Sequence, residues 1–354
     1  MFMERLEALR QHLRNENLPA ILVTNPVNVA YLSGFTGTAG VLLITEKQAY
    51  LLTDFRYLEQ AGQQAAGFTV VDAAGDIWEK TAETLGDVPA LAVESDHLTV
   101  DTYGKLAQAF GKTQLKAIIS PLRCLRQIKS AQEIRAIKAA AALADQAFVH
   151  ILPLIKPGVR ERDLALELEF FMRRQSAEGL AFPIIVASGY RSAMPHGTAS
   201  DKVIVEGEAV VLDFGCIVDG YCSDMTRTVF VGKVTARQRT VYEAVLSAQK
   251  TALAYLQPGI SGRQADSLAR DVLKEYRLAE YFGHGLGHGV GREVHEEPRL
   301  SPLSDDMLQS GMVVTVEPGV YLQQEFGVRI EDLVVITDDG ICNLTAGSKE
   351  LLCL

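Results

Sequence analysis

Three histidines stand among glycines in the segment FGHGLGHGVGREVHEEP, residues 282–298. They are His284, His288 and His295, and a fourth histidine, His196, lies in the stretch MPHGTA. Imidazole changes protonation state near neutral pH and binds metal ions, so such a group can serve acid-base chemistry or metal coordination. Flanking glycines let the backbone and a substrate approach the rings closely. The alternative for any one of these histidines is an ordinary place in a turn or in the core.

Two common arrangements of histidine and glycine are absent from the segment. The histidines lack the HExxH spacing, which excludes the helical zinc site of many metalloproteases. The glycines lack the GxGxxG spacing followed by a helix, and the chain contains no GKS or GKT. A nucleotide-binding loop is therefore disfavoured.

Two aspartates flank a predicted hairpin in residues 208–232. The Asp-Gly pair at 219–220 is a strong signal for a two-residue turn. A turn there places Asp224 opposite Gly215, two places from Asp213, so both carboxylates lie on one face, ~7 to 8 Å apart at the backbone. Because paired carboxylates resist burial, a positive group such as a metal ion is predicted between them. The alternative is two independent, solvent-facing aspartates.

Two glutamates lie in apolar strand patterns further along the chain. Glu317 ends the predicted strand in GMVVTVEPGVYL, and Glu331 lies inside the predicted strand of GVRIEDLVVIT, with Arg329 two residues earlier on the same face. A buried charge is usually paired, so a salt bridge is the alternative to a ligand role for either glutamate. Two Asp, one His and two Glu are the usual makings of an oxygen-rich two-metal site. Such a set favours manganese or cobalt over structural zinc.

The elements that position these residues fall into two predicted domains, 1–125 and 126–354. The first alternates six short apolar runs with helical stretches, beginning with an amphipathic helix, and is predicted to be α/β. A long alanine-rich helix with a capping box at Ser130 and Glu133 opens the second. There, hairpin signals predict an antiparallel α+β sheet, with helices near 161–178, 235–257 and 261–277. The resemblance between KPGVRERDLALELEF and QPGISGRQADSLARDVL, each with an expected capped helix start, indicates an internal duplication.

Composition excludes several classes of function. The 354 residues are 48% hydrophobic and 22% charged, and the apolar runs are short, which predicts a soluble cytoplasmic protein with no membrane partner. The five cysteines are scattered and form no CxxC pair, so neither a disulfide framework nor a thiolate zinc site is expected. A formal net charge of -10 without clustered Lys and Arg argues against nucleic acid as a partner.

Taken in order along the chain, these motifs resemble those of the pita-bread metallopeptidases, which include prolidase, aminopeptidase P and methionine aminopeptidase. The resemblance covers essentially the whole chain. The amino-terminal motifs YLSGFTGTAG and LLTDFRYLEQA are similar to the smaller creatinase-like domain of the proline-specific branch, which plain methionine aminopeptidases lack. The motifs that match the five metal-ligand motifs of the family are VLDFG with Asp213, YCSDMTRT with Asp224, GHGVG with His288, TVEPG with Glu317 and RIED with Glu331.

The resemblance implies a fold, a cofactor and roles. A pita-bread α+β domain would follow the smaller α/β domain and hold two divalent ions, of which Mn²⁺ is expected and Co²⁺ or Zn²⁺ are alternatives. The ions would activate a bridging water as the nucleophile. Glu317 would carry its proton to the leaving nitrogen, His295 would stabilise the oxyanion and His196 would position the proline. His284 looks like the further histidine that prolidases often carry ahead of the ligand, on the substrate side.

The expected substrate is an Xaa-Pro peptide, whose tertiary amide has no N–H for a general peptidase to grip. The prediction is an Xaa-Pro dipeptidase, and an Xaa-Pro aminopeptidase acting on longer peptides is the alternative. A dipeptidase needs a cation for the free carboxylate, and Arg299 and Arg329 are candidates, with a structural ion pair as the alternative for each. A non-catalytic peptide-binding protein and a metal-free amidinohydrolase are remote alternatives, because both require a broken ligand set. The resemblance also implies a homodimer.

Overall fold

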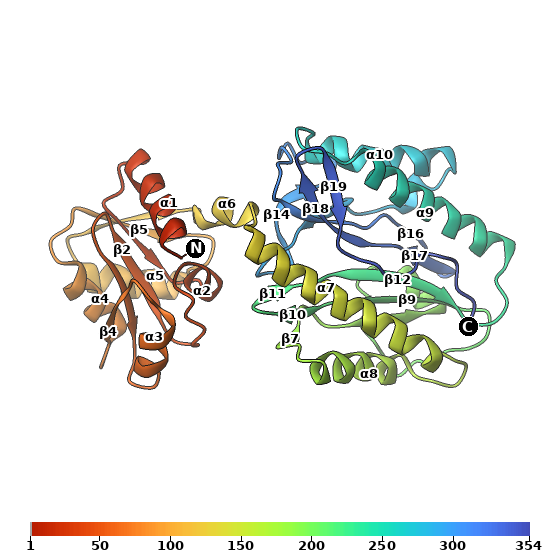
Figure 1. Ribbon diagram of the computed structural model, residues 1–354, viewed down its shortest axis with the longest axis horizontal. Helices are drawn as coiled ribbons and strands as arrows, with labels where there is room; N and C mark the ends of the chain where they lie inside the picture. The colour runs from red at the N-terminus through yellow and green to blue at the C-terminus, as the bar shows by residue number, and fades with distance from the viewer. Residues whose placement is uncertain (1) are drawn as a thin grey trace. The chain divides into compact units, whose positions relative to one another are not determined.

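The amino-terminal apolar runs form one mixed sheet of six strands. The computed structural model describes residues 2–354 (Figure 1), and the chain divides into one unit ending at Leu125 and a second, Arg126–Leu354. In the first unit the strand order is β4-β3-β2-β1-β5-β6, antiparallel from β1 to β3 and parallel elsewhere. All six predicted strands are present, and their bounds are β1 (Ala20–Val23), β2 (Val41–Thr45), β3 (Ala49–Thr53), β4 (Thr69–Asp72), β5 (Ala90–Glu94) and β6 (Gln114–Ile118).

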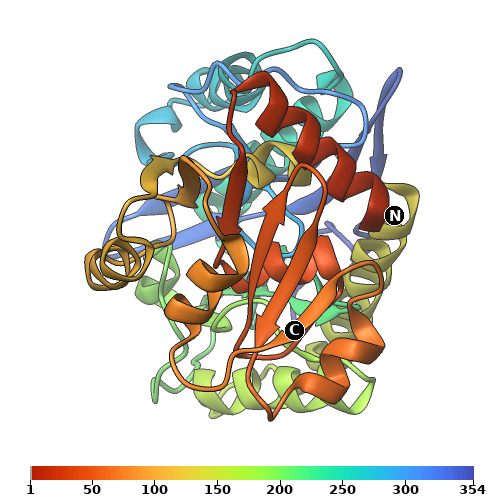
Figure 2. The same ribbon diagram turned by 90° about the vertical axis from the view of Figure 1, so that its left-hand side faces the viewer.

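Helices cover both faces of this sheet, because successive strand residues point to opposite sides. Ile21 and Val23 pack with the helix that begins the chain, whereas Leu22 packs with the pair formed by Ile77–Leu85 and Val100–Phe110. Figure 2 shows α1 alongside the strands. The α/β prediction for this unit is confirmed, with the helices α1 (Phe2–Asn15), α2 (Pro26–Ser33), α3 (Leu58–Gln64), α4 (Ile77–Leu85) and α5 (Val100–Phe110).

Every strand pair of the second unit is antiparallel, as the hairpin signals predict. The sheets have the orders β11-β10-β7, β12-β9-β8, β14-β13-β15-β18-β19 and β16-β17. The strands are β7 (Gly179–Leu180), β8 (Ile185–Ser188), β9 (Ala209–Phe214), β10 (Cys216–Val218), β11 (Tyr221–Cys222), β12 (Met225–Phe230), β13 (Gly287–Gly289), β14 (Glu296–Leu300), β15 (Val313–Val316), β16 (Gly319–Leu322), β17 (Phe326–Arg329), β18 (Asp332–Thr337) and β19 (Gly340–Asn343).

Four long helices flank these sheets (Figure 1). The pair α7 (Ala131–Ile151) and α8 (Glu161–Arg174) packs on β8, β9 and β12, and the pair α9 (Ala236–Tyr255) and α10 (Gly262–Glu275) packs on the sheet that contains β15. The predicted capping box of Ser130 and Glu133 is confirmed at the start of α7. A short helix, α6 (Leu122–Gln127), precedes it and ends before Ile128 pairs with Met312. Within residues 2–354, the helical stretch Ala131–Leu154 is long and apolar enough to cross a membrane by length and composition. Its apolar face lies in the core of the unit, as expected for a core helix.

The internal duplication predicted from the two Pro-Gly segments is visible in the backbone hydrogen bonds. Gly158 N–H donates to Ile204 O, and Gly259 N–H donates to Leu308 O in the second half. The predicted capped start is correct for α10, whose capping box uses Ser261. It is wrong for α8, because Arg160 at its N-cap makes no capping side-chain hydrogen bond. The backbone carbonyls of residues 200 and 202 accept the first N–H groups of this helix instead.

Candidate metal centre and substrate cavity

One cavity of the second unit brings together all of the predicted site residues. Its volume is about 470 Å³, within the range of sites that bind small ligands. Carboxylates and histidines meet in this cavity with one exposed arginine and several apolar side chains, a combination that serves both metal binding and peptide binding. The predicted residues that line it are His196, Asp213, Asp224, His284, His288, His295, Arg299, Glu317, Arg329 and Glu331.

The two aspartates occupy the positions that the hairpin turn predicts. Val218 pairs with Tyr221, and the same register continues into β9 and β12, where Thr226 pairs with Asp213. Asp224 therefore lies two residues from the partner of Asp213, on the same face of the sheet. Asp213 is 8% exposed and Asp224 is 5% exposed, so these are not independent solvent-facing aspartates.

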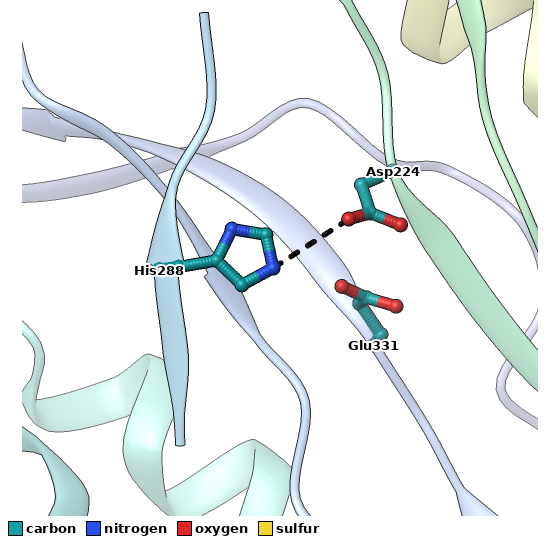
Figure 3. A group of neighbouring side chains, drawn as sticks. All are labelled: Asp224, His288 and Glu331. Atoms are coloured by element: carbon teal, nitrogen blue, oxygen red, sulfur yellow. Dashed lines mark ion pairs between the residues drawn. The ribbon is translucent and has the colours of Figure 1, made fainter. Parts of the chain in front are cut away.

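Asp224, His288 and Glu331 converge from three separate segments of the chain (Figure 3). One potential ligand atom from each lies within 4.8 Å of the others, and His288 Nε2 is 3.7 Å from Asp224 Oδ2. The prediction that Glu331 lies inside a strand is wrong, because it lies between β17 and β18, where the chain passes from one sheet to another. Its carboxylate Oε2 accepts a hydrogen bond of 2.6 Å from the Thr226 hydroxyl, which fixes its orientation.

Glu317 directly follows β15 and faces the same imidazole. Its Oε1 is 3.3 Å from His288 Nε2 and accepts a hydrogen bond of 3.1 Å from the Thr315 hydroxyl. The other ring nitrogen, His288 Nδ1, is 3.1 Å from Gly289 O. A carbonyl can only accept, so Nδ1 donates its proton there and Nε2 is directed to the carboxylates, the orientation that metal-binding histidines adopt.

Arg329 has a different setting from the free cation predicted for substrate binding. It is 3% exposed, and its Nη2 is 2.5 Å from Asp213 Oδ2. Its Nε donates to the Thr226 hydroxyl and its Nη1 to the Tyr321 hydroxyl and to Pro195 O. This is the structural ion pair that the sequence left as the alternative, and Arg329 acts as a partner that orients Asp213.

A hydrogen-bond chain continues from Arg329 to His284, which is flanked by glycines as His288 is. Tyr321 Oη is 2.8 Å from both Arg329 Nη1 and His284 Nε2. Burial raises the pKa of Tyr321 to about 12, so the phenol keeps its proton and donates it to His284. His284 Nδ1 is 2.8 Å from Gly285 O and carries the other proton. Burial also lowers the pKa of His284, in agreement with a neutral ring.

The carboxylates of the cluster have opposed electrostatic settings. Burial, and then the charges of neighbouring carboxylates, raise the pKa of Asp224 and Glu331 well above the usual range. Burial also raises the pKa of Asp213, although Arg329 opposes it. Burial opposes ionisation of Glu317 as well, but the hydrogen bond and charge of His288 outweigh it and lower the pKa to about 2. Such a cluster stores unfavourable charge that a cation would relieve.

A stability measurement on metal-free protein tests this setting. Because the pKa of Asp224 is higher in the folded than in the unfolded protein, its protonated side chain favours the folded state. This contribution to the free energy of unfolding is fully present below the unfolded pKa of about 3.9 and is lost as the pH rises through the folded-state pKa. With a chelator present, Asp224→Asn is therefore expected to be more stable than the wild type at pH 8, by about 1.4 kcal/mol for each unit of the shift. The difference in free energy of unfolding should shrink toward zero near pH 4. A difference independent of pH would contradict the raised pKa.

Exposed cationic and imidazole groups line the side of the cavity next to the cluster. The His295 ring lies 4.4 Å from the His288 ring, measured between centroids. Arg299 on β14 is the direct cross-strand partner of His288, so the two side chains share a face. The Arg299 side chain forms no ion pair within residues 2–354, whereas the Arg329 guanidinium pairs with Asp213. Burial, and then the charge of His288, lower the pKa of His295, which favours its neutral form.

Several lining residues were not identified from the sequence. Phe182, Pro183 and Ile185 form an apolar wall, and Ile185 pairs directly with Asp213 across β8 and β9. The signal in the sequence is AFPIIV, an apolar stretch shortly before His196. Tyr321 was also missed; it lies on β16, four residues after Glu317, and the pairing of β16 with β17 brings Arg329 beside it.

The residues present fit the binding of divalent metal ions. Asp213 Oδ1 is buried and has no hydrogen-bond partner among residues 2–354, so one oxygen of this carboxylate is available as a ligand. Buried Asp224 and Glu331 have raised pKa values that a cation would reverse. The oxygen-rich donor set with one imidazole nitrogen is typical of sites for such ions.

The fold and this site together define a pita-bread metallopeptidase with a creatinase-like amino-terminal domain. Comparisons with known proteins agree. The pattern of metallopeptidase family M24 matches residues 135–338, and that of the creatinase/prolidase N-terminal domain matches residues 5–128. The chain belongs to metallopeptidase family M24, in its proline-specific branch, and is a metallopeptidase.

Relatives with assigned activities span essentially the whole chain. It is 39% identical to an Xaa-Pro dipeptidase of Pyrococcus furiosus, with 99% of each chain covered. Its structure is similar to that of an Xaa-Pro dipeptidase from Bacillus anthracis, with 45% identity, a TM-score of 0.98 and all of both chains covered. It is also similar to an X-Pro aminopeptidase from Thermotoga maritima, with 38% identity, a TM-score of 0.89 and 95% and 97% of the two chains covered. The similar proteins therefore include both candidate activities.

Proposed function

We propose that this protein is an Xaa-Pro dipeptidase that hydrolyses the peptide bond before a carboxyl-terminal proline. The observation that carries the proposal is Arg299, which is exposed in the cavity on the same face as His288 and has no ion pair within residues 2–354. A free guanidinium beside the reacting centre matches the carboxylate that ends an Xaa-Pro dipeptide. Arg329 does not compete for this role, because Asp213 and Tyr321 already accept its hydrogen bonds.

The carboxylates and His288 would hold two divalent ions. Mn²⁺ is the ion that we propose, with Co²⁺ or Zn²⁺ as alternatives. Asp213 would hold one ion and His288 the other, and Asp224, Glu317 and Glu331 would supply further ligands. Ions at such a site supply Lewis acidity toward the scissile carbonyl and a nucleophile from water near neutral pH.

The chain's own groups would then do the remaining work. Glu317 is a carboxylate at neutral pH, and it can accept a proton from the attacking water and deliver it to the proline nitrogen. Neutral His295 would donate to the oxygen on which charge develops. His196, exposed at the cavity, would contact the proline side of the substrate, and the apolar wall around Ile185 would contact the residue before proline.

Substrate length is the direct test of this proposal. After removal of metal and addition of Mn²⁺, Co²⁺ or Zn²⁺, we expect cleavage of Ala-Pro and little cleavage of Ala-Pro-Ala, because the tripeptide moves the carboxylate away from Arg299. Equal or faster cleavage of the tripeptide would identify an Xaa-Pro aminopeptidase instead. Inactivity on both peptides with all three ions would overturn the catalytic proposal and favour a peptide-binding protein. The homodimer and the cytoplasmic location stay predictions.

A further inference from the structure

The segment Phe282–His288 carries two functional imidazoles but has few side chains to hold it. Close packing requires two of its glycines: a Cβ on Gly287 would lie 2.1 Å from Thr315 O, and one on Gly285 would lie 2.7 Å from Leu300 O. The segment has no regular secondary structure before β13. Its position must therefore come from contacts to its backbone.

A pair of charged residues on α10 makes those contacts. Asp266 and Arg270 lie one helical turn apart and form a two-point ion pair, with Nε to Oδ2 at 2.8 Å and Nη2 to Oδ1 at 3.0 Å. Arg270 also donates to Phe282 O at 2.8 Å and to His284 O at 2.9 Å. Asp266 Oδ1 accepts the Leu286 N–H at 3.0 Å.

These contacts hold alternate residues of the segment. The carbonyls of residues 282 and 284 and the N–H of residue 286 all meet the same ion pair, which is the pattern of an extended chain held along one edge. The guanidinium also lies over the Phe282 ring, 4.3 Å from its centroid. Asp266 is 2% exposed and the Arg270 side chain 21%, so the pair is a largely buried anchor and not a surface contact.

We propose that the Asp266–Arg270 pair is the positioning element of the histidine segment, setting the place of His288 Nε2 in the metal centre and of His284 beside Tyr321. Neither residue lines the cavity or touches the carboxylate cluster. The pair acts through the backbone, because moving residues 284 and 286 moves the start of β13, which carries His288. The inference rests on the proposed metal-binding role of His288.

Cobalt titration of metal-free protein tests the proposal without relying on activity. Arg270→Met is expected to weaken Co²⁺ binding about 10- to 100-fold, the range typical of groups that orient metal ligands, and to change the visible Co²⁺ spectrum. The Co²⁺ affinity of Arg270→Lys should lie between those of the wild type and Arg270→Met. An ammonium can pair with Asp266, but it lacks the planar fork of donors that holds both carbonyls. The matched control is Asp271→Asn, which breaks an exposed pair with Lys274 on the same helix and should leave both readouts unchanged.

The outcomes separate positioning from simple stability. A lower melting temperature with wild-type Co²⁺ affinity and spectrum in both Arg270→Lys and Asp266→Asn would overturn the proposal, even if Arg270→Met does not fold. His288→Ala serves as the reference. Wild-type Co²⁺ binding by that variant would show that His288 is not a ligand, which would contradict the proposed metal site and not the role of the Asp266–Arg270 pair. Weakened Co²⁺ binding in His288→Ala and in Arg270→Met, with Asp271→Asn unaffected, would support both the metal-binding role of His288 and the positioning role of the Asp266–Arg270 pair.

Discussion

Replacing Glu331 with glutamine is expected to lower peptidase activity at least ~10³-fold while the protein stays folded. Lewis-acid stabilisation by bound ions is worth several kcal/mol, and each 1.36 kcal/mol is a factor of ten in rate. Glutamine keeps the size of the side chain and an oxygen for the Thr226 hydroxyl, which donates to Glu331 in the wild type. The substitution therefore removes the charged ligand and little else. Turnover of Ala-Pro with saturating Mn²⁺ measures the effect.

Metal binding provides a second readout for the same variant. A ligand present at 100 times its Kd stabilises a protein by about 2.7 kcal/mol, which raises the melting temperature of a domain of this size by about 2–4 °C per kcal/mol. The wild type should show this shift on addition of Mn²⁺ and Glu331→Gln should not. Glu325→Gln is the control, because it removes one negative charge from an exposed pair with Arg237. Wild-type turnover by Glu331→Gln would refute Glu331 as a ligand.

The aspartate pair could be predicted because its geometry depends on a local signal. Asp219 and Gly220 both adopt positive φ, 50° and 71°, as a two-residue hairpin turn requires, and glycine takes such a conformation without strain. Once the turn is fixed, the period of two along each strand decides which carboxylates share a face. Nothing outside residues 213–224 is needed for that conclusion.

The histidines could not be placed in the same way. Nothing in the spacing of His196 and His288 shows that they line one cavity, because the contact depends on how separate sheets pack. Their convergence was expected from the resemblance to a family and not from local physics. The interruption of the strand at Glu331 was missed for a related reason: apolar residues stand on both sides of the charged residues in GVRIEDLVVIT, and only tertiary pairing shows that the chain changes sheets there.

The arginine partners of the site could be predicted only in part. Arg329 was a candidate for binding the substrate carboxylate, with a structural ion pair as the alternative, and the structure shows the ion pair, formed with Asp213, 116 residues away. Other segments around the cavity are held by similar buried pairs between residues far apart in sequence. Charge alone does not identify the partner of an arginine, since a long side chain reaches any carboxylate that the fold brings near. The pairs are Glu161 with Arg191, Arg227 with Asp332, and Arg126 with Glu296.

Arg299 provides the contrast, because it has no such partner within residues 2–354, and its substitution should change substrate preference and not chemistry. A charge-assisted hydrogen bond contributes about 1.5–3 kcal/mol, so Arg299→Met is expected to lower kcat/KM for Ala-Pro about 10- to 150-fold, mainly through KM. The matched substrate is Ala-Pro amide, which lacks the carboxylate: the wild type should prefer Ala-Pro, and the variant should treat the two alike. The neighbouring basic residue Arg292 lies over the Tyr221 ring, 5.2 Å from its centroid, and does not line the cavity, so Arg292→Met should keep the wild-type preference. If Arg299→Met retains the full preference for the free carboxylate, another group recognises it, and exposed His196 becomes the next residue to substitute.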